Sequence, residues 1–349
     1  MDNQEKPYKR RVRYSGKYPK SYKEKYKELN PDKYQETIDK VKLKGSTPAG
    51  MHIPIMVKEI IEFLDIKPGD IGLDATLGYG GHSAEMLQKL NGQGHLYSLD
   101  IDPIELPKTT KRLRDQGFGE DVFTPHLINF SEIDSVVSES NSFDFVLADL
   151  GVSSMQIDNP ERGFSFKTDG PLDLRMDPQN GIPASIKLMN LNTTELEDLL
   201  IENADEPYAS EIATAVVNAK RKGIYIDTTS KLRKIIIDAL QFIDYESRDR
   251  DIKKSCQRTF QALRIDVNQE FDSIINFLDK LPDTLSSGGK VAVLSFHSGE
   301  DRLVKKSFKR LFNEGVYSEI SQEIIRPTEE ECRENGRARS TKLRWAIKA

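Results

Sequence analysis

The sequence predicts an α/β protein built on a mainly parallel, doubly wound sheet. Helix-like and strand-like patterns alternate from about residue 55 to residue 148, as in consecutive βαβ units. A glycine-rich loop at residues 78–81 follows one strand pattern and opens a helix pattern. The short apolar run at 143–148 is typical of a buried parallel strand, and Asp149 follows it directly. Because ligands bind beyond the carboxyl ends of such strands, Asp149 is expected in a cleft.

Hydrophobic periodicity and turn residues place each element of this alternation. The first helix, at residues 55–64, has apolar side chains on one face and ends before Lys67-Pro-Gly-Asp70. Further elements follow in order: strand 71–74, helix 82–90, strand 95–99, helix 104–116, strand 143–148, helix 266–281, strand 289–296, helix 300–312 and strand 342–347. Between the two blocks, helical patterns at 194–203, 208–221 and 229–243 occur with little strand character.

These patterns divide the chain into three parts. Residues 1–49 form a basic, Tyr/Lys-rich N-terminal extension, which ends in the turn-forming run Gly45-Ser-Thr-Pro-Ala-Gly50. Residues 50–154 and 258–349 form the α/β domain, and residues 155–257 form a helical insertion. Since the insertion leaves the sheet just after Ser154, we expect it to cover the site and to recognise the substrate.

The composition of the 349 residues favours a soluble, cytoplasmic protein. The hydrophobic fraction of 37% supports a core, and no apolar run approaches the roughly 18 residues of a membrane span. The first residues lack the apolar segment of a secretion signal. Cys256 and Cys332 are close neither to each other nor to the histidines in sequence, so no zinc site and no structural metal are expected.

The N-terminal extension carries a charge opposite to that of the whole chain. The net charge is −5, whereas the first 49 residues contain 14 Lys/Arg against 7 Asp/Glu and half of the 12 tyrosines. Tyr14, Tyr18, Tyr22 and Tyr26 recur every four residues among lysines, a pattern suited to an RNA backbone and unpaired bases. A solvated tail without a partner explains the same composition equally well.

The loop Asp74-Ala-Thr-Leu-Gly-Tyr-Gly-Gly-His-Ser83 is a candidate cofactor site. Its glycines let backbone amides approach a ligand, and Asp100, which ends the next strand, can accept both ribose hydroxyls of an adenosine. A dinucleotide site usually has a third glycine where this chain has Ser83, so the loop favours S-adenosylmethionine. Taken alone, His82 is better explained as a helix-start residue and Phe130 as a core residue.

Taken together, the motifs resemble those of the 16S rRNA (cytosine(1402)-N(4))-methyltransferases, the MraW methylases. The match extends over about 295 residues and comprises His52-Ile-Pro-Ile-Met-Val-Lys-Glu, the loop at 74–83, Asp149-Leu-Gly-Val-Ser-Ser-Met-Gln, Glu161-Arg-Gly-Phe-Ser-Phe, Asp169-Gly-Pro-Leu-Asp-Leu-Arg-Met-Asp, Arg258-Thr-Phe-Gln-Ala-Leu-Arg-Ile, Leu294-Ser-Phe-His-Ser and Arg337-Ala-Arg-Ser-Thr-Lys-Leu-Arg. The resemblance implies a class I, Rossmann-like methyltransferase sheet with an inserted helical domain. It also implies methylation of a cytidine in 16S rRNA of the small ribosomal subunit.

The resemblance assigns the cofactor site residue by residue. The S-adenosylmethionine contacts that it implies are Gly80, Gly81, His82, Asp100, Phe130, Asp149 and Gln156. The exocyclic amine of cytosine is a weak nucleophile, because its lone pair is delocalised into the ring. An acceptor for the amine hydrogens helps it to react, and we expect Asp149 to be that catalytic acceptor.

Six further residues are candidates for substrate contact. Arg162, Arg258 and Arg264 match phosphate oxygens, although each would serve equally in structural ion pairs. Phe164 and Phe166 are candidates for stacking on the target base, since the Asp149-Leu-Gly-Val motif has no aromatic ring of its own. His297 follows a strand and either contacts substrate or caps a helix. For Asp173, Arg175 and Asp177, a salt-bridged loop is at least as good an explanation as catalysis.

Four features depart from the family pattern. Lys254-Ser-Cys-Gln257 replaces the usual His-Pro-Ala-Thr, Gly299 replaces a usual Leu, Tyr79 stands where Gly or Arg is frequent, and the basic extension is additional. They leave open a methyltransferase acting on another rRNA or DNA base, or a non-catalytic RNA-binding protein of ribosome assembly. A dinucleotide oxidoreductase is the least favoured alternative.

Overall fold

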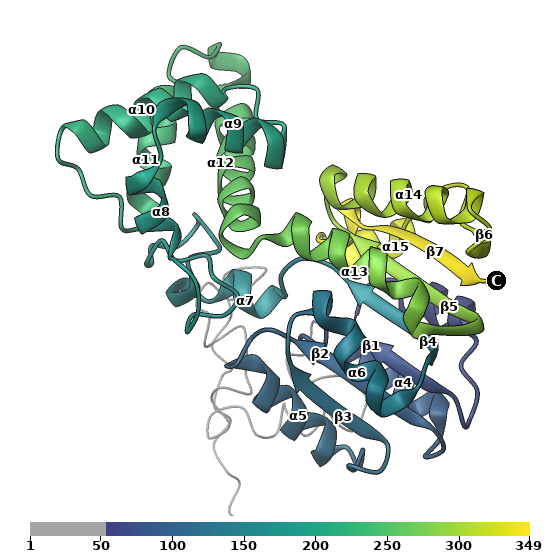
Figure 1. The fold of residues 1–349 in the computed structure, drawn as a ribbon. Helices are drawn as coiled ribbons and strands as arrows, with labels where there is room; N and C mark the ends of the chain where they lie inside the picture. The colour runs from purple at the N-terminus through teal and green to yellow at the C-terminus, as the bar shows by residue number, and fades with distance from the viewer. Residues whose placement is uncertain (1–53) are drawn as a thin grey trace, which may run out of the picture. The chain divides into compact units, whose positions relative to one another are not determined.

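A computed structural model describes residues 54–349, so the N-terminal extension lies outside the described residues. The strands, which can be followed in Figure 1, are β1 (Ile71–Asp74), β2 (His95–Asp100), β3 (Phe123–Leu127), β4 (Phe143–Asp149), β5 (Leu285–Ser295), β6 (Tyr317–Ile320) and β7 (Lys342–Lys348). They form one sheet in the order β3-β2-β1-β4-β5-β7-β6. The first five are parallel, and β7 runs antiparallel to β5 and β6. The predicted, mainly parallel α/β sheet is therefore confirmed.

Helices precede, connect and follow these strands. They are α3 (Val57–Leu64), α4 (Gly81–Leu90), α5 (Glu105–Asp115), α6 (Ile133–Ser140), α7 (Ser154–Asp158), α8 (Ala184–Asn190), α9 (Thr193–Ala204), α10 (Ala209–Arg221), α11 (Thr229–Ala239), α12 (Tyr245–Asn268), α13 (Glu270–Thr284), α14 (Ser298–Asn313) and α15 (Glu329–Glu334), with short 3₁₀ turns at η2 (Phe130–Glu132), η3 (Pro160–Arg162) and η4 (Ala338–Ser340). No helix among residues 54–349 is long and apolar enough to cross a membrane.

The two faces of the sheet are covered by separate apolar cores, because alternate strand residues point to opposite faces. In β4, Val146 and Ala148 join the core that contains Phe277 of α13 and Phe308 of α14. The neighbouring Phe145 and Leu147 join the core that contains Ile60 of α3 and Leu87 of α4. A strand buried on both faces in this way needs a continuous apolar sequence, which is why residues 143–148 are recognisable without a structure.

Helices α8 to α12 share a third core, which runs from Phe164 to Leu263. Neighbouring pairs among α9, α10, α11 and α12 are in contact, and Figure 1 shows these helices side by side. The long α12 continues unbroken through residue 257, the boundary that the sequence pattern predicts for the insertion. The domain limits therefore stay a prediction, whereas the helical nature of the segment is plain.

Several elements differ from the sequence prediction. The helix expected at 266–281 begins at Glu270, because Gln269 is left-handed (φ 49°) and separates α12 from α13. Strand β3 was not predicted: it is a five-residue edge strand with Pro125 at its centre, a residue that only edges or bulges accommodate easily. The other edge, β6, has only four residues and two polar ones at its centre. Both edges lack the apolar run that identifies the buried strands.

Gly72 on β1 gives a test of the packing between the central strands. A Cβ at this position would lie 2.0 Å from Cζ of Phe145, its neighbour on β4. We expect Gly72→Ala to lower the free energy of unfolding by about 1–3 kcal/mol, because the buried ring must move. Urea denaturation measures the change. Gly336→Ala is the matched control, since no atom lies within 4 Å of its added Cβ; equal effects of the two substitutions would contradict the packing argument.

Candidate active site at the carboxyl edge of the sheet

The strand order has a switch point at β1, which has β2 on one side and β4 on the other. The connections run in opposite directions from these neighbouring strands, and ligands of open α/β sheets bind at such a switch point. Three strands end there in aspartates: β1 in Asp74, β2 in Asp100 and β4 in Asp149. Residues far apart in the sequence are therefore brought to one edge, as the strand pattern predicts.

Protein neighbours require glycine at several positions of the glycine loop. Gly78 and Gly80 have positive φ angles of 49° and 78°, which glycine adopts without strain. A Cβ on Gly80 would lie 2.7 Å from Thr109, and one on Gly81 would lie 2.5 Å from Pro54. Gly81 begins α4, so the loop presents a helix N-terminus with free backbone N–H groups. The glycines predicted to bind the cofactor are thus also required for packing.

Helix α5 fixes the back of this loop. The Thr109 hydroxyl donates to the Gly78 carbonyl (2.6 Å), and Arg112 donates to the Tyr79 carbonyl (3.0 Å). The Arg112 guanidinium also stacks on the Tyr79 ring, 3.5 Å from its centroid. Tyr79, one of the four departures from the family pattern, therefore has a structural role on the α5 side of the loop.

Asp100 is positioned by backbone donors. One carboxylate oxygen accepts the N–H of Gly78 (2.8 Å), and the other accepts the N–H of Asp102 (2.8 Å). Burial raises the pKa of Asp100 to about 6, although these two bonds oppose the shift. The group is therefore mainly ionised at neutral pH, and each oxygen keeps a second lone pair for a ligand hydroxyl.

Asp74 and Thr76 connect the end of β1 to the end of β4. The fully buried Asp74 accepts the Ser83 hydroxyl (2.6 Å) and the Thr76 N–H (3.1 Å), and its burial raises its pKa. Thr76 in turn accepts the backbone N–H of Asp149 (2.6 Å). Asp74 stands in the quoted motif, but the sequence did not identify it or Thr76 as the support of Asp149.

Asp149 has one oxygen beside a histidine and one without a partner. Its Oδ2 lies 3.6 Å from Nδ1 of His82, whereas its Oδ1 is buried and accepts no hydrogen bond within residues 54–349. Burial raises the pKa of Asp149 to about 6; His82 lowers it, while the charges of Asp74 and Glu300 raise it further. A buried acceptor without a donor is costly unless a ligand provides the missing hydrogen.

Gln156 and Arg162 meet at a residue that the sequence did not identify, Asp102. The Asp102 carboxylate is completely buried, and its Oδ2 accepts from Gln156 Nε2 (2.7 Å) and Arg162 Nη1 (2.8 Å). Gln156 Oε1 accepts the Ser153 N–H in the capping box of α7. Arg162 also donates to the carbonyls of Arg175 and Met176. Both side chains are thus bonded within the protein, and for Arg162 the geometry favours the structural alternative over a phosphate contact.

The three predicted aromatic residues lie in different surroundings. Phe130 is half-buried at η2 and packs edge-on against Phe277, with ring centroids 5.5 Å apart. Phe164 belongs to the buried core of the helical segment, and Phe166 packs edge-on against Phe260 in that same core. Phe130 therefore keeps exposed area just after β3, whereas Phe164 and Phe166 mainly pack in the core of the helical segment.

Arg264 and His297 belong to an ion-pair cluster beside Gly151. Arg264 donates to both oxygens of Glu270 (2.8 and 2.9 Å), and His297 Nε2 lies 3.0 Å from Oε1 of Glu300. His297 caps α14 through Nδ1, as its capping alternative predicts. A Cβ on Gly151 would lie 3.6 Å from that Glu300 oxygen. The cluster therefore packs directly against the Asp149-Leu150-Gly151 turn.

The charged groups of this cluster act on one another. Burial raises the pKa of Glu300, but His297 and the Arg264 charge outweigh that effect and hold it below its ordinary value. Ligand atoms of Glu270, His297 and Glu300 lie within 4.8 Å of one another, a spacing compatible with a metal ion. However, Arg264 already donates to both Glu270 oxygens, and Nδ1 of His297 already accepts the Glu300 N–H. We therefore describe the group as an ion-pair network.

Gly299, another departure from the family pattern, lies next to this network. Its added Cβ would be 2.6 Å from Cζ of Phe271 and 3.2 Å from Nδ1 of His297. The Phe271 ring lies 5.9 Å from the His297 ring, measured between centroids. The space that a longer side chain at position 299 would need is thus filled by an aromatic ring from α13.

Arg258 differs from the other candidate arginines. It lies half-exposed in the middle of α12, and it forms no hydrogen bond or ion pair with any of residues 54–349. By contrast, Arg175 forms a two-point ion pair with Asp173 (2.7 and 2.8 Å), which supports the salt-bridged explanation of that loop. Arg258 is therefore the candidate whose charge is still available to a partner.

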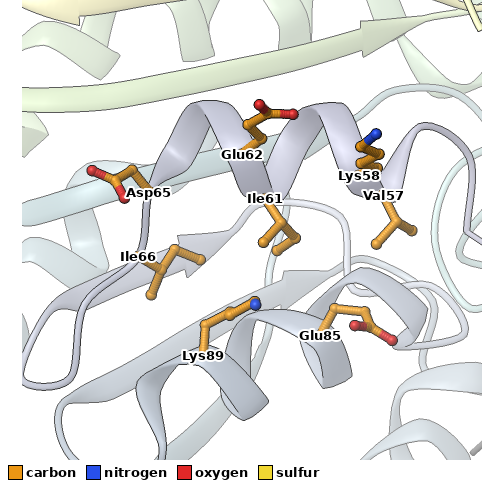
Figure 2. A pocket seen from close by; sticks show the side chains of 8 residues that line it. All are labelled: Val57, Lys58, Ile61, Glu62, Asp65, Ile66, Glu85 and Lys89. Carbon is orange, nitrogen blue, oxygen red and sulfur yellow. The ribbon is translucent and has the colours of Figure 1, made fainter.

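A groove between α3 and α4 lies apart from these residues. Figure 2 shows Ile61 and Ile66 pointing toward α4, which contributes Glu85 and Lys89, and the volume is about 500 Å³. None of the residues predicted for the site lines this groove. We therefore place the candidate site at the strand ends.

Comparison with known proteins identifies a family model and several relatives that match most of the chain. The family model described as "MraW methylase family" matches residues 49–349. Ribosomal RNA small subunit methyltransferase H 1 of Lachnoclostridium phytofermentans is 62% identical over 348 residues, which cover 100% of this chain and 95% of that protein. Ribosomal RNA small subunit methyltransferase H 2 of Alkaliphilus metalliredigens is 62% identical over 349 residues and 100% of both chains.

More distant relatives match a shorter part of the chain. Ribosomal RNA small subunit methyltransferase H of Carboxydothermus hydrogenoformans is 39% identical over 314 residues, which cover 85% of this chain and 97% of that protein. The N-terminal extension thus has a counterpart in the relatives at 62% identity but lies before the part that the family model matches.

The buried pair of Asp102 and Arg162 generates a stability prediction. Asp102→Ala leaves a guanidinium with only 7% side-chain exposure without its counter-charge, so we expect a loss of about 3–5 kcal/mol in the free energy of unfolding. Denaturant unfolding measures it. The control is Asp115→Ala, which breaks the exposed pair with Lys111 and should cost less than about 1 kcal/mol. If both variants lost the same small amount of unfolding free energy, the stabilising role of the buried pair of Asp102 and Arg162 would be refuted.

Proposed function

The chain belongs to the MraW methylase family, and from this membership we propose that it methylates RNA of the small ribosomal subunit. The methyl donor is S-adenosylmethionine, and the target is the N4 amine of a cytidine, the 16S position 1402 of the family. The relatives at 62% identity carry the name ribosomal RNA small subunit methyltransferase H, which supports the RNA substrate. With this substrate, we also propose that the enzyme acts in the cytoplasm.

The residues at the strand ends suit S-adenosylmethionine. Asp100 offers carboxylate oxygens for the ribose hydroxyls, and the N-terminus of α4, which begins at Gly81, offers backbone N–H groups for the carboxylate. The Gly80 N–H already donates to the Leu77 carbonyl (2.7 Å), so Gly80 contributes through its backbone conformation. Phe130 offers a partly exposed ring beside β3 for the adenine. When bound, the cofactor supplies an electrophilic methyl group on a sulfonium. The Gln156 amide is already bonded to Ser153 and to Asp102. We therefore propose that Gln156 supports the cofactor site by holding α7 against Asp102.

The observation that carries the proposal is the buried, unpartnered Oδ1 of Asp149. A cytosine amine has two hydrogens to donate, and donation to a carboxylate makes its nitrogen lone pair more available for reaction. With its pKa at about 6, Asp149 is mainly ionised at neutral pH and can accept such a bond. Lower pH protonates it, so activity should fall as the pH decreases through about 6.

The proposed role of Asp149 is tested with small subunits that lack decoding-centre methylation. Incubation with S-adenosylmethionine, followed by mass spectrometry of the digested RNA, should yield N4-methylcytidine at one position. Asp149→Ala should lower kcat by about 10²- to 10⁴-fold, because the acceptor for the amine is lost. Cofactor affinity, measured by calorimetry, separates this loss from a binding defect.

Asp198→Ala, an exposed carboxylate on α9, is the control and should keep full activity. Full turnover by Asp149→Ala at saturating cofactor would remove Asp149 from the mechanism. Cofactor binding without methylation of any subunit would instead favour the non-catalytic RNA-binding alternative, and a methyl group on another nucleotide would favour a shifted substrate.

Arg258 is our candidate for a contact with the RNA backbone, because it alone among the three arginines has no internal partner within residues 54–349. We expect Arg258→Ala to weaken binding to small subunits and to reduce the slope of log K against log salt by about 0.7. Filter binding at several salt concentrations measures the slope. Arg333→Ala, an exposed arginine of α15 paired with Glu329, is the matched control. An unchanged slope in Arg258→Ala would exclude the contact.

A further inference from the structure

His82 is held in one orientation by a backbone oxygen. Its Nε2 lies 3.0 Å from the carbonyl oxygen of Ile55, and the residue is only 9% exposed. A carbonyl oxygen can only accept a hydrogen bond, so Nε2 must carry the hydrogen. In the neutral ring, Nδ1 is then a bare lone pair. The tautomer of His82 thus follows from its contact with Ile55.

The bare nitrogen faces a carboxylate. Nδ1 lies 3.6 Å from Oδ2 of Asp149, so two acceptors face each other between a nearly buried imidazole and a carboxylate side chain that is 29% exposed. One shared proton stabilises such a pair. On Asp149, the proton makes the carboxyl group a hydrogen-bond donor to Nδ1; on His82, it makes an imidazolium cation beside the carboxylate. The second oxygen of Asp149, Oδ1, has no partner within residues 54–349 and is the one assigned to the substrate amine.

Two further carboxylates act on the pair of His82 and Asp149. Asp74 at the end of β1 and Glu300 of α14 both act on Asp149, and Asp74 also interacts with His82. Arg264 and His297 also face Glu300, and both lower its pKa. An added proton on the pair is therefore surrounded by negative charge, which stabilises it.

We propose that His82 takes up, through Asp149, the proton that the target amine releases on methylation. This inference rests on the proposed function. The newly methylated nitrogen carries a positive charge; its N–H bond breaks, and an O–H bond forms on Asp149. A half-turn of the carboxyl group brings that hydrogen to Nδ1, where the O–H bond breaks and an N–H bond forms. The imidazolium beside the restored carboxylate loses its proton to water after the product leaves.

The test compares pH–rate profiles of the wild type and His82→Gln in single turnovers with small subunits. Glutamine keeps an N–H near the Ile55 carbonyl but offers no basic nitrogen. In the wild type, the rate should fall as the pH drops through about 6, where Asp149 becomes protonated. In the variant, the interaction with His82 that lowers the pKa of Asp149 is lost, so the falling limb should move to higher pH. Because the proton acceptor is also lost, the rate at pH 7.5 should drop about tenfold or more.

Two controls accompany this comparison. Cofactor affinity is measured by calorimetry and the turnovers are run at saturating cofactor, so that a binding defect is separated from the loss of the proton acceptor. His126→Gln, on the edge strand β3, should leave the profile unchanged. If His82→Gln only weakens cofactor binding and keeps the wild-type limb, His82 merely anchors the loop, and the proposal is overturned.

A measurement on the wild-type protein covers the case in which the variant does not fold. Nitrogen NMR of the His82 ring at high pH should report hydrogen on Nε2 and none on Nδ1. Hydrogen on Nδ1 alone at high pH would overturn the proposal. Because this readout needs no RNA, failure of the proposed substrate and failure of the proton acceptor are distinguishable.

Discussion

The rest of the structure depends on four aspartates at one edge of the sheet, of which Asp74 and Asp102 are buried and Asp100 and Asp149 partly buried. Asp74, Asp100, Asp102 and Asp149 all lie at or just beyond strand ends, and burial acts to raise the pKa of the three that end a strand. The protein must supply the hydrogen bonds that water would have given. Ser83, backbone N–H groups and Arg162 do so for the first three. Asp149 alone keeps an oxygen without a donor.

The same hydrogen bonds join parts of the chain that are distant in sequence. Asp102, after β2, binds Gln156 of α7 and Arg162 of η3, which lead into the helical segment. Thr76, after β1, binds the backbone of Asp149 at the end of β4. Because each carboxylate is stable only with these partners, the cofactor loop, the strand ends and the first turn of the insertion form one hydrogen-bonded unit. This is a stricter requirement than apolar packing, which tolerates volume-conserving exchanges.

The sequence predicts the parts of the site that obey a topological rule. Parallel strands end at one edge, so Asp100, Asp149 and the glycine loop were identifiable from apolar runs and spacing. Asp102 was not, because its partners lie 54 and 60 residues away and only the fold brings them together. Phe164 and Phe166 have the composition of a stacking site, but the helical segment buries or packs them in its own core. Strand β3 was missed because an edge strand does not need an apolar run.

The contact between Gly299 and Phe271 implies a constraint on how this lineage could have diverged. The family motif usually has Leu where this chain has Gly299, yet a Cβ there would approach the Phe271 ring to 2.6 Å. A side chain at position 299 therefore requires the Phe271 ring to move. The contact also touches His297, so exchanging only one of the two segments with a relative would disturb the network beside Gly151. A chimera is expected to keep this contact when α13 and the start of α14 come from the same parent.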